Sequence, residues 1–261
     1  MKLRPRRWLA DRLRLHGCGQ WDALAERAGA LPPGRLRRLR DEGRALRRDL
    51  DRFIARAQLR LDGTGRAADV PHLPPGTDWR WRPGVLLARL DRPGIAAPDS
   101  GTRLGEETGL WHDCVSRALV LRQLPNRSAA DLAPYGLQLE TMGFRGSYLS
   151  IAIDLPPESL AGLTRGHILR LDSVLSVERP LSIFARLNIG HGPNTDSALR
   201  HLGDFRPDET TPRVVEFDLH YLDINERRLE KMWLDLIFEA PQMNAARIRD
   251  LFLSRHPRAQ V

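Results

Sequence analysis

The sequence is poor in cysteine, in lysine and in long apolar runs. Cys18 and Cys114 are its two cysteines and lie in parts of different character, so we expect no structural disulfide, which fits a reducing compartment. No apolar run reaches the roughly 20 residues that a membrane-spanning helix needs. Residues 1–8 are basic, but neither an apolar segment nor a small-residue cleavage site follows them. We therefore expect a cytoplasmic protein, at most peripheral to a membrane.

Lysine is almost absent, because every basic residue other than Lys2 and Lys231 is arginine. A codon bias toward arginine or a need for arginine chemistry would each explain this. The charge itself is unevenly spread along the chain. Residues 1–66 contain 18 basic and 8 acidic residues, a net charge of +10, whereas the 23 basic and 25 acidic residues that remain give −2. The basic excess is therefore confined to the N-terminal quarter.

That quarter reads as helical. Two short helices are expected within residues 6–30, with a break at Gly17 and Gly19. A longer helix over 35–61 has apolar residues at alternating intervals of three and four, the heptad pattern, at Leu36, Leu39, Gly43, Leu46, Leu50, Phe53 and Ala57. This seam packs on the sheet domain or on the two short helices, pairs with a second copy to give a homo-oligomer through residues 35–57, or binds another partner.

The other faces of the long helix carry many arginines. These side chains are candidates for binding an anionic membrane or a nucleic acid, because both partners present phosphates. The alternative is a solvated helical face, and no nucleic-acid recognition motif accompanies the charge. The arginines concerned are Arg37, Arg40, Arg44, Arg47 and Arg48.

The C-terminal part alternates apolar and polar residues with a period of two, which is typical of strands with one buried face. Met232, Leu234, Leu236 and Phe238 show the pattern clearly, and so does the run from 214 to 221. Further strands are expected at 114–121, 137–142, 147–155, 168–177, 180–189 and 248–253, with a possible one at 79–82.

The segments between these runs are expected to be turns, loops and short helices. Residues 91–109 read as loop, 144–147 as a hairpin turn, and 156–162 and 197–202 as short helical turns. Many short strands without long crossover helices indicate a mainly β protein with a helical N-terminal arm. The sheet part is an antiparallel β-sandwich of jelly-roll type with about eight strands. We expect a basic arm over 1–61, a linker over 62–76 and the sandwich over 77–261.

Three stretches together resemble an uncharacterised alphaproteobacterial family with no assigned activity. They lie at 110–114, 185–195 and 233–241, and the resemblance covers roughly residue 79 to 261. It implies no catalytic residues. More loosely, the pattern of paired strands resembles the galactose-binding-like jelly rolls of carbohydrate-binding modules, a likeness of architecture that does not fix function.

The best candidate for a ligand site is the segment 188–196. Asn188, His191, Asn194 and Asp196 offer donors and acceptors beside two glycines, at which a backbone approaches a ligand closely. Trp111 is added as an aromatic surface on which a sugar can stack. The alternative is a turn whose polar side chains bind their own backbone.

No catalytic residue, metal site or cofactor is predicted. His112, Asp113 and Cys114 are metal-ligand types, but neighbours along a strand point to opposite faces. Asp218 and Asp235 are a possible cross-strand pair without a general-acid environment. The leading hypothesis is a non-enzymatic protein whose sandwich binds a glycan or a protein partner. The alternative is an assembly protein that acts through its arm, and a sugar-active enzyme comes third.

Overall fold

The computed structural model describes residues 5–64, 73–128, 130–207 and 209–259, without some of the side chains within the helices. The chain divides into two compact units, residues 1–50 and residues 51–261. The predicted linker, 62–76, lies partly outside the described residues, so the predicted arm and sandwich boundaries stay predictions.

The N-terminal part consists of helices α1 (Pro5–Glu26) and α2 (Pro33–Thr64), joined by a short 3₁₀ turn at Ala28–Ala30. The predicted break at Gly17 and Gly19 is wrong, because α1 runs through both. Glycine within a helix lowers its stability by about 1 kcal/mol relative to alanine. It keeps its backbone N–H, however, so the hydrogen bonds of the helix continue through both residues. The ring of Trp21 in α1 lies against Gly43 of α2. A Cβ atom at that glycine would come within 3.3 Å of the ring. No helix in the described part of the chain is long and apolar enough to cross a bilayer.

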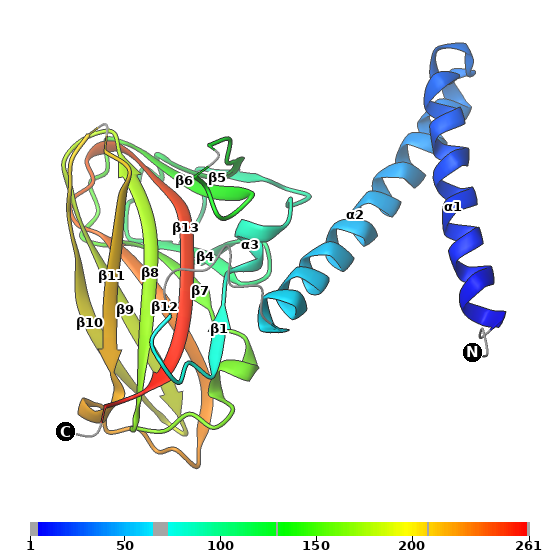
Figure 1. Ribbon diagram of the computed structural model, residues 1–261. Coiled ribbons are helices and arrows are strands. Elements are labelled where there is room, and N and C mark those ends of the chain that lie inside the picture. Colours follow the sequence, from blue (N-terminus) through cyan, green and yellow to red (C-terminus); the bar gives the residue numbers. More distant parts are fainter. Residues whose placement is uncertain (1–4, 65–72, 129, 208, 260–261) are drawn as a thin grey trace. The chain divides into compact units, whose positions relative to one another are not determined.

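The strands from Trp79 onward form an antiparallel β-sandwich (Figure 1). Its described residues form thirteen strands, more than the eight expected: β1 (Trp79–Trp81), β2 (Gly94–Ala96), β3 (Thr102–Leu104), β4 (Thr108–His112), β5 (Leu119–Pro125), β6 (Tyr135–Met142), β7 (Leu149–Asp154), β8 (His167–Val177), β9 (Leu181–His191), β10 (Asn194–Phe205), β11 (Thr211–Asp218), β12 (Leu229–Phe238) and β13 (Met243–Pro257). Helix α3 (Gly84–Leu87) and 3₁₀ turns at Pro157–Leu160 and Leu219–Tyr221 complete the fold. The mainly β fold class is confirmed.

Two sheets face each other. One has the order β11-β8-β13-β6-β5-β2, with β1 also paired to β13, and the other has the order β10-β9-β12-β7-β4-β3. The core between them is aliphatic and aromatic. Phe217, Leu234, Leu236, Phe238 and Leu253 are each at most 2% exposed, which confirms the buried face assigned to the run 232–238.

Three local expectations are wrong. The segment 91–109 contains β2, β3 and part of β4, because neighbouring strands supply the pairing that its composition does not suggest. Residues 197–202 are not helical but lie in β10, paired with β9 along its length. The turn at 144–147 joins no hairpin, since β6 and β7 belong to different sheets.

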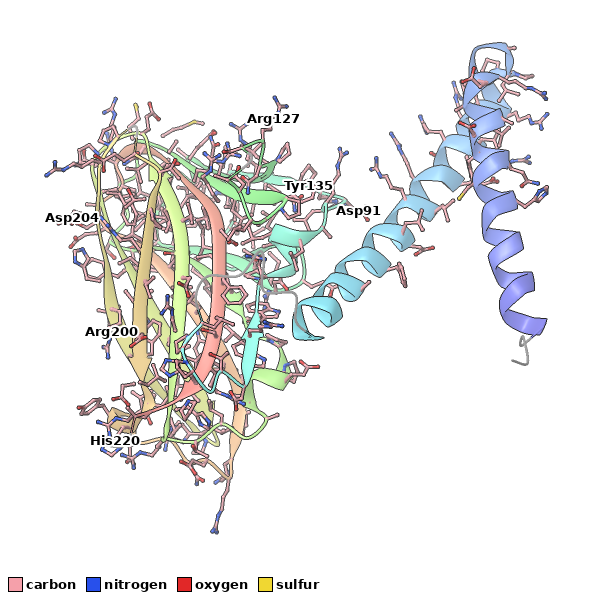
Figure 2. All side chains as sticks on the ribbon, viewed as in Figure 1. Asp91, Arg127, Tyr135, Arg200, Asp204 and His220 are labelled. Atoms are coloured by element: carbon pink, nitrogen blue, oxygen red, sulfur yellow. The ribbon has the colours of Figure 1, made fainter. Side chains whose placement is uncertain are left out.

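The two sheets meet at one edge, where β10 and β11 are neighbours. Arg200 of β10, labelled in Figure 2, donates from Nε to the carbonyl of Glu216 in β11 at 2.9 Å. Its guanidinium also lies 5.9 Å from the ring centre of Phe217. One side chain therefore connects the two sheets and satisfies part of an otherwise open strand edge.

Candidate functional site

The segment predicted as a ligand-binding loop is a tight β-hairpin. Strand β9 ends at His191 and β10 begins at Asn194, with two residues between them. Gly192 has φ of 58°, in the left-handed region that favours glycine, and a Cβ there would come within 2.9 Å of the Arg228 guanidinium carbon. The glycine therefore serves the turn and its close contact with Arg228.

The predicted residues of this segment separate onto two faces. His191 is buried and its Nε2 lies 2.9 Å from Oδ2 of Asp196. Asn188 lies three residues earlier on the same strand, so its side chain points to the opposite face of the sheet. Asn194 is exposed beside the turn. The structure brings His191 together with Asp196 and places Asn188 elsewhere.

Asn188 belongs to a polar cluster on the outer face of the six-stranded sheet. Its Nδ2 donates to Oδ2 of Asp235 at 3.0 Å, and Arg186 donates to the same oxygen from Nε at 3.0 Å and from Nη2 at 2.8 Å. Asp235 is 4% exposed although it faces outward, whereas the Arg186 side chain is 45% exposed. The buried carboxylate thus binds the buried Asn188 amide and fixes one exposed donor, Arg186, at the surface.

The same face carries a row of small residues beside two tryptophans. Strand pairing aligns Asp235 with Ala152 and Ala152 with Gly109, and it aligns Trp111 with Ser150. We call this surface the outer platform, made of Gly109, Trp111, Ser150, Ala152, Arg186, Asn188, Trp233 and Asp235. Trp111 and Asn188, both predicted from the sequence, share this surface three strands apart.

Trp111 is the most accessible aromatic plane of the platform. Its side chain is 48% exposed. Its ring lies against Gly101 and Gly109, since a Cβ atom at either glycine would come within 3.3 Å of the indole. Both neighbours lack a side chain, so the indole rests close to the backbone of β4 and the turn before β3. An indole held with one side open to solvent is the surface on which a sugar ring stacks.

Trp233 differs from Trp111 because a cation already contacts it. The Lys231 ammonium lies 4.6 Å from its ring centre. The stem of that lysine passes over Gly190 of β9, where a Cβ would come within 3.0 Å of it. Trp233 and Lys231 therefore form one border of the platform, while Trp111 provides the open aromatic surface.

The residues considered as metal ligands have other partners. His112 Nδ1 accepts the backbone N–H of Cys114 at 3.1 Å, and its Nε2 lies 3.1 Å from the carbonyl of Pro98. Asp113 accepts the backbone N–H groups of Ser147, at 2.7 Å, and Tyr148, at 3.2 Å, in the loop before β7. Among the described residues there is no group of three or more His, Cys, Asp or Glu side chains that could hold a metal ion.

Asp113 holds the loop before β7 through Ser147 and Tyr148, and its effect on stability should depend on pH. The Ser147 hydroxyl, then the Ser147 amide, hold the pKa of Asp113 at about 2, below its ordinary value. Because the pKa is lower in the folded state, the stabilisation is present above about pH 4 and is lost as the pH falls toward 2. We expect Asp113→Asn to lower the unfolding midpoint at pH 6 and to match the wild type near pH 2. Asp223→Asn, at an exposed carboxylate, is the control, and a pH-independent difference for Asp113→Asn would contradict the assignment.

Several platform residues were not predicted as site residues from the sequence. Arg186 and Asp235 are 49 residues apart and meet only through the pairing of β9 with β12. The predicted pair of Asp218 and Asp235 does not form, because β11 and β12 belong to different sheets. The alternation of residues along β12 could have indicated part of the platform, because it places Trp233 and Asp235 on the face opposite Leu234.

Comparison with solved structures finds distant likenesses. A xylan-binding domain of family 22 has 9% identity and a TM-score of 0.39, and covers 73% of this chain and 100% of its own. The first xylan-binding module of Paenibacillus barcinonensis Xyn10C has 9% identity and a TM-score of 0.38, over 64% and 94%. The tailspike protein 4 domain of bacteriophage CBA120 has 8% identity and a TM-score of 0.40, over 56% of this chain and 19% of its own, so this chain spans about a fifth of it.

The first two are xylan-binding domains. A search of curated proteins gives no match. A family model does match, over residues 1–261, so the relationship covers the helices as well as the sandwich. The chain therefore belongs to a family of unknown function, DUF6478.

Proposed function

We propose that the sandwich is a non-enzymatic binding module that holds a glycan on its outer platform. The observation that carries the proposal is the half-exposed indole of Trp111, which lies over two glycines beside the small side chains of Ser150 and Ala152. Sugar rings present an apolar face and a rim of hydroxyls. An open indole suits the face, and fixed polar groups suit the rim.

The polar cluster supplies those fixed groups. Arg186 and the buried Asn188 both donate to the Asp235 carboxylate, so a ligand hydroxyl meets an exposed guanidinium that is already held in place. The carboxylates of this face are engaged, Asp235 by Arg186 and Asp154 by Arg103 at 2.7 Å. A glycoside hydrolase needs one carboxyl that donates a proton, and an arginine partner disfavours that state. Binding without cleavage is therefore the function that this face supports.

Trp111→Ala tests the proposal. A broad glycan array identifies a ligand for the wild-type chain, and calorimetry then measures its affinity for each variant. Loss of the stacking surface should weaken binding about ten- to hundred-fold, about 1.4–2.8 kcal/mol. Tyr221→Ala, at an aromatic residue that is 75% exposed outside the platform, should bind as the wild type does.

Two further variants separate the platform from the hairpin. Asn188→Ala should weaken binding, whereas a double change of His191 and Asn194 to alanine should not, because those residues lie outside the platform. The reverse result would move the site to the 191–196 hairpin. A glycan array without a single ligand would leave a protein partner as the better hypothesis for this face.

A further inference from the structure

Helix α2 carries an apolar stripe that helix α1 does not bury. Leu46, Leu50 and Phe53 are spaced by four and three residues, so they lie along one side of the helix. Their exposed fractions are 41%, 51% and 68%. No described side chain of α1 or α2 is buried, and the ring of Trp21 in α1 lies against α2 at Gly43. The stripe therefore resembles a binding face more than one half of a finished core.

Arginines accompany the stripe. Arg40 and Arg47 each follow a leucine of the seam by one residue, which is about 100° around the helix axis, so they flank the apolar side. Both are exposed, as are Arg37 and Arg44, whereas the side chain of Arg48 lies outside the described residues. Glu42 and Asp49 lie on the other flank, and Arg38 is paired with Glu42 at 3.6 Å. Arg40 donates from Nη2 to Oδ1 of Asp41 at 2.9 Å, an exposed pair of small net stability that a lipid phosphate can replace. Arg40 and Arg47 thus make one border of the stripe basic.

These two features together distinguish three possible occupants. A second copy would cover the stripe, but it would bring two segments of net charge +10 together. A nucleic acid would use the arginines and leave the leucines and Phe53 in water. The interface of an anionic bilayer uses both, because apolar side chains enter the headgroup boundary while arginines contact lipid phosphates.

We propose that α2 lies on an anionic bilayer, with Leu46, Leu50 and Phe53 in the headgroup–acyl boundary and with Arg40 and Arg47 on lipid phosphates. The evidence is the exposure of the stripe and the charge difference between residues 1–66 and the rest of the chain. The proposal is independent of the glycan site, since no residue of the outer platform takes part. In this proposal α2 lies on the surface of the membrane and does not cross it.

Vesicle flotation of the full chain tests the proposal. Vesicles of phosphatidylglycerol and phosphatidylcholine should bind the chain, vesicles of phosphatidylcholine alone should bind at least ten-fold less, and salt should weaken the binding. Leu50→Ser with Phe53→Ser should lower the partition coefficient more than ten-fold. Arg40→Gln with Arg47→Gln should lower it about 25-fold, about five-fold for each charge. Arg127→Gln with Arg227→Gln, the same change at exposed arginines of the sandwich, should have no effect.

Circular dichroism shows whether each variant keeps its helices, and the arginine variant tests the proposal even if the serine variant unfolds α2. Full binding by the serine variant would overturn it, as would equal binding to both vesicle types. Tighter binding to duplex DNA than to anionic vesicles, lost in the arginine variant and kept in the serine variant, would assign the arm to nucleic acid instead. A concentration-dependent dimer that the serine variant abolishes, without vesicle binding, would assign the stripe to a second copy.

Discussion

Phe238→Ala is expected to lower the free energy of unfolding by about 3–5 kcal/mol. Phe238 ends strand β12 in the middle of the six-stranded sheet, pairs with Ile183 of β9 and is 2% exposed. Alanine removes most of the ring's buried area and leaves a cavity, because the paired strands on either side cannot close around a single missing ring. Chemical denaturation at 25 °C measures the loss.

Leu199→Ala is the control for this prediction. Leu199 is also a large apolar residue of the same sheet, but it is 51% exposed, and surface changes of this kind usually stay within about 0.5 kcal/mol. An equal loss in both variants would show that general strand preference, and not burial, determines stability. An unchanged midpoint for Phe238→Ala would contradict the register of β12.

Long alternating strands were predictable because the alternation itself reports burial on one face. The run at 168–177 is β8 and that at 180–189 is β9, each within two residues of its observed ends. The expectation for 114–121 was less accurate, since β5 begins at Leu119 and the preceding residues form a turn. Alternation also misplaced Tyr221, because a 3₁₀ turn at Leu219–Tyr221 interrupts the strand and exposes that ring.

Short strands were not predictable, and the reason lies in their energetics. Strands β2 and β3 have three residues each and take their stability from β5 and β4 beside them. The helical expectation for 197–202 failed for the same reason, since pairing with β9 outweighs the helix preference of alanine and leucine. Local composition does not contain these partners.

The candidate site was predictable only in part. Trp111 and Asn188 were identified by residue type, but their placement on one face depends on four strands joining in the order β9-β12-β7-β4. The sequence suggests a different partner for Asp235, namely Asp218, and gives no signal that singles out Arg186. Strand parity alone, applied to Asn188 and His191, would have separated those two residues, because they are three positions apart.

Asp250→Ala should cost about as much as Phe238→Ala, for an electrostatic reason. Arg82 donates to Asp250 from Nε at 2.8 Å and from Nη2 at 3.0 Å, and both side chains are 7% exposed. The arginine also lies 5.3 Å from the ring centre of Phe252. Removing the carboxylate leaves a buried guanidinium without its partner, which costs about 3–5 kcal/mol.

The double variant Arg82→Met with Asp250→Leu separates this penalty from the value of the pair itself. Removing both charges also removes the desolvation cost of each, so the double variant should recover most of the stability that Asp250→Ala loses. Urea unfolding of the wild type, each single variant and the double variant completes the cycle. The matched control is Asp99→Ala, whose partner Arg117 is half exposed, and that change should shift the midpoint very little. If the double variant is no more stable than Asp250→Ala, the pair stabilises the sandwich by its geometry, and the account based on an unpaired buried charge is wrong.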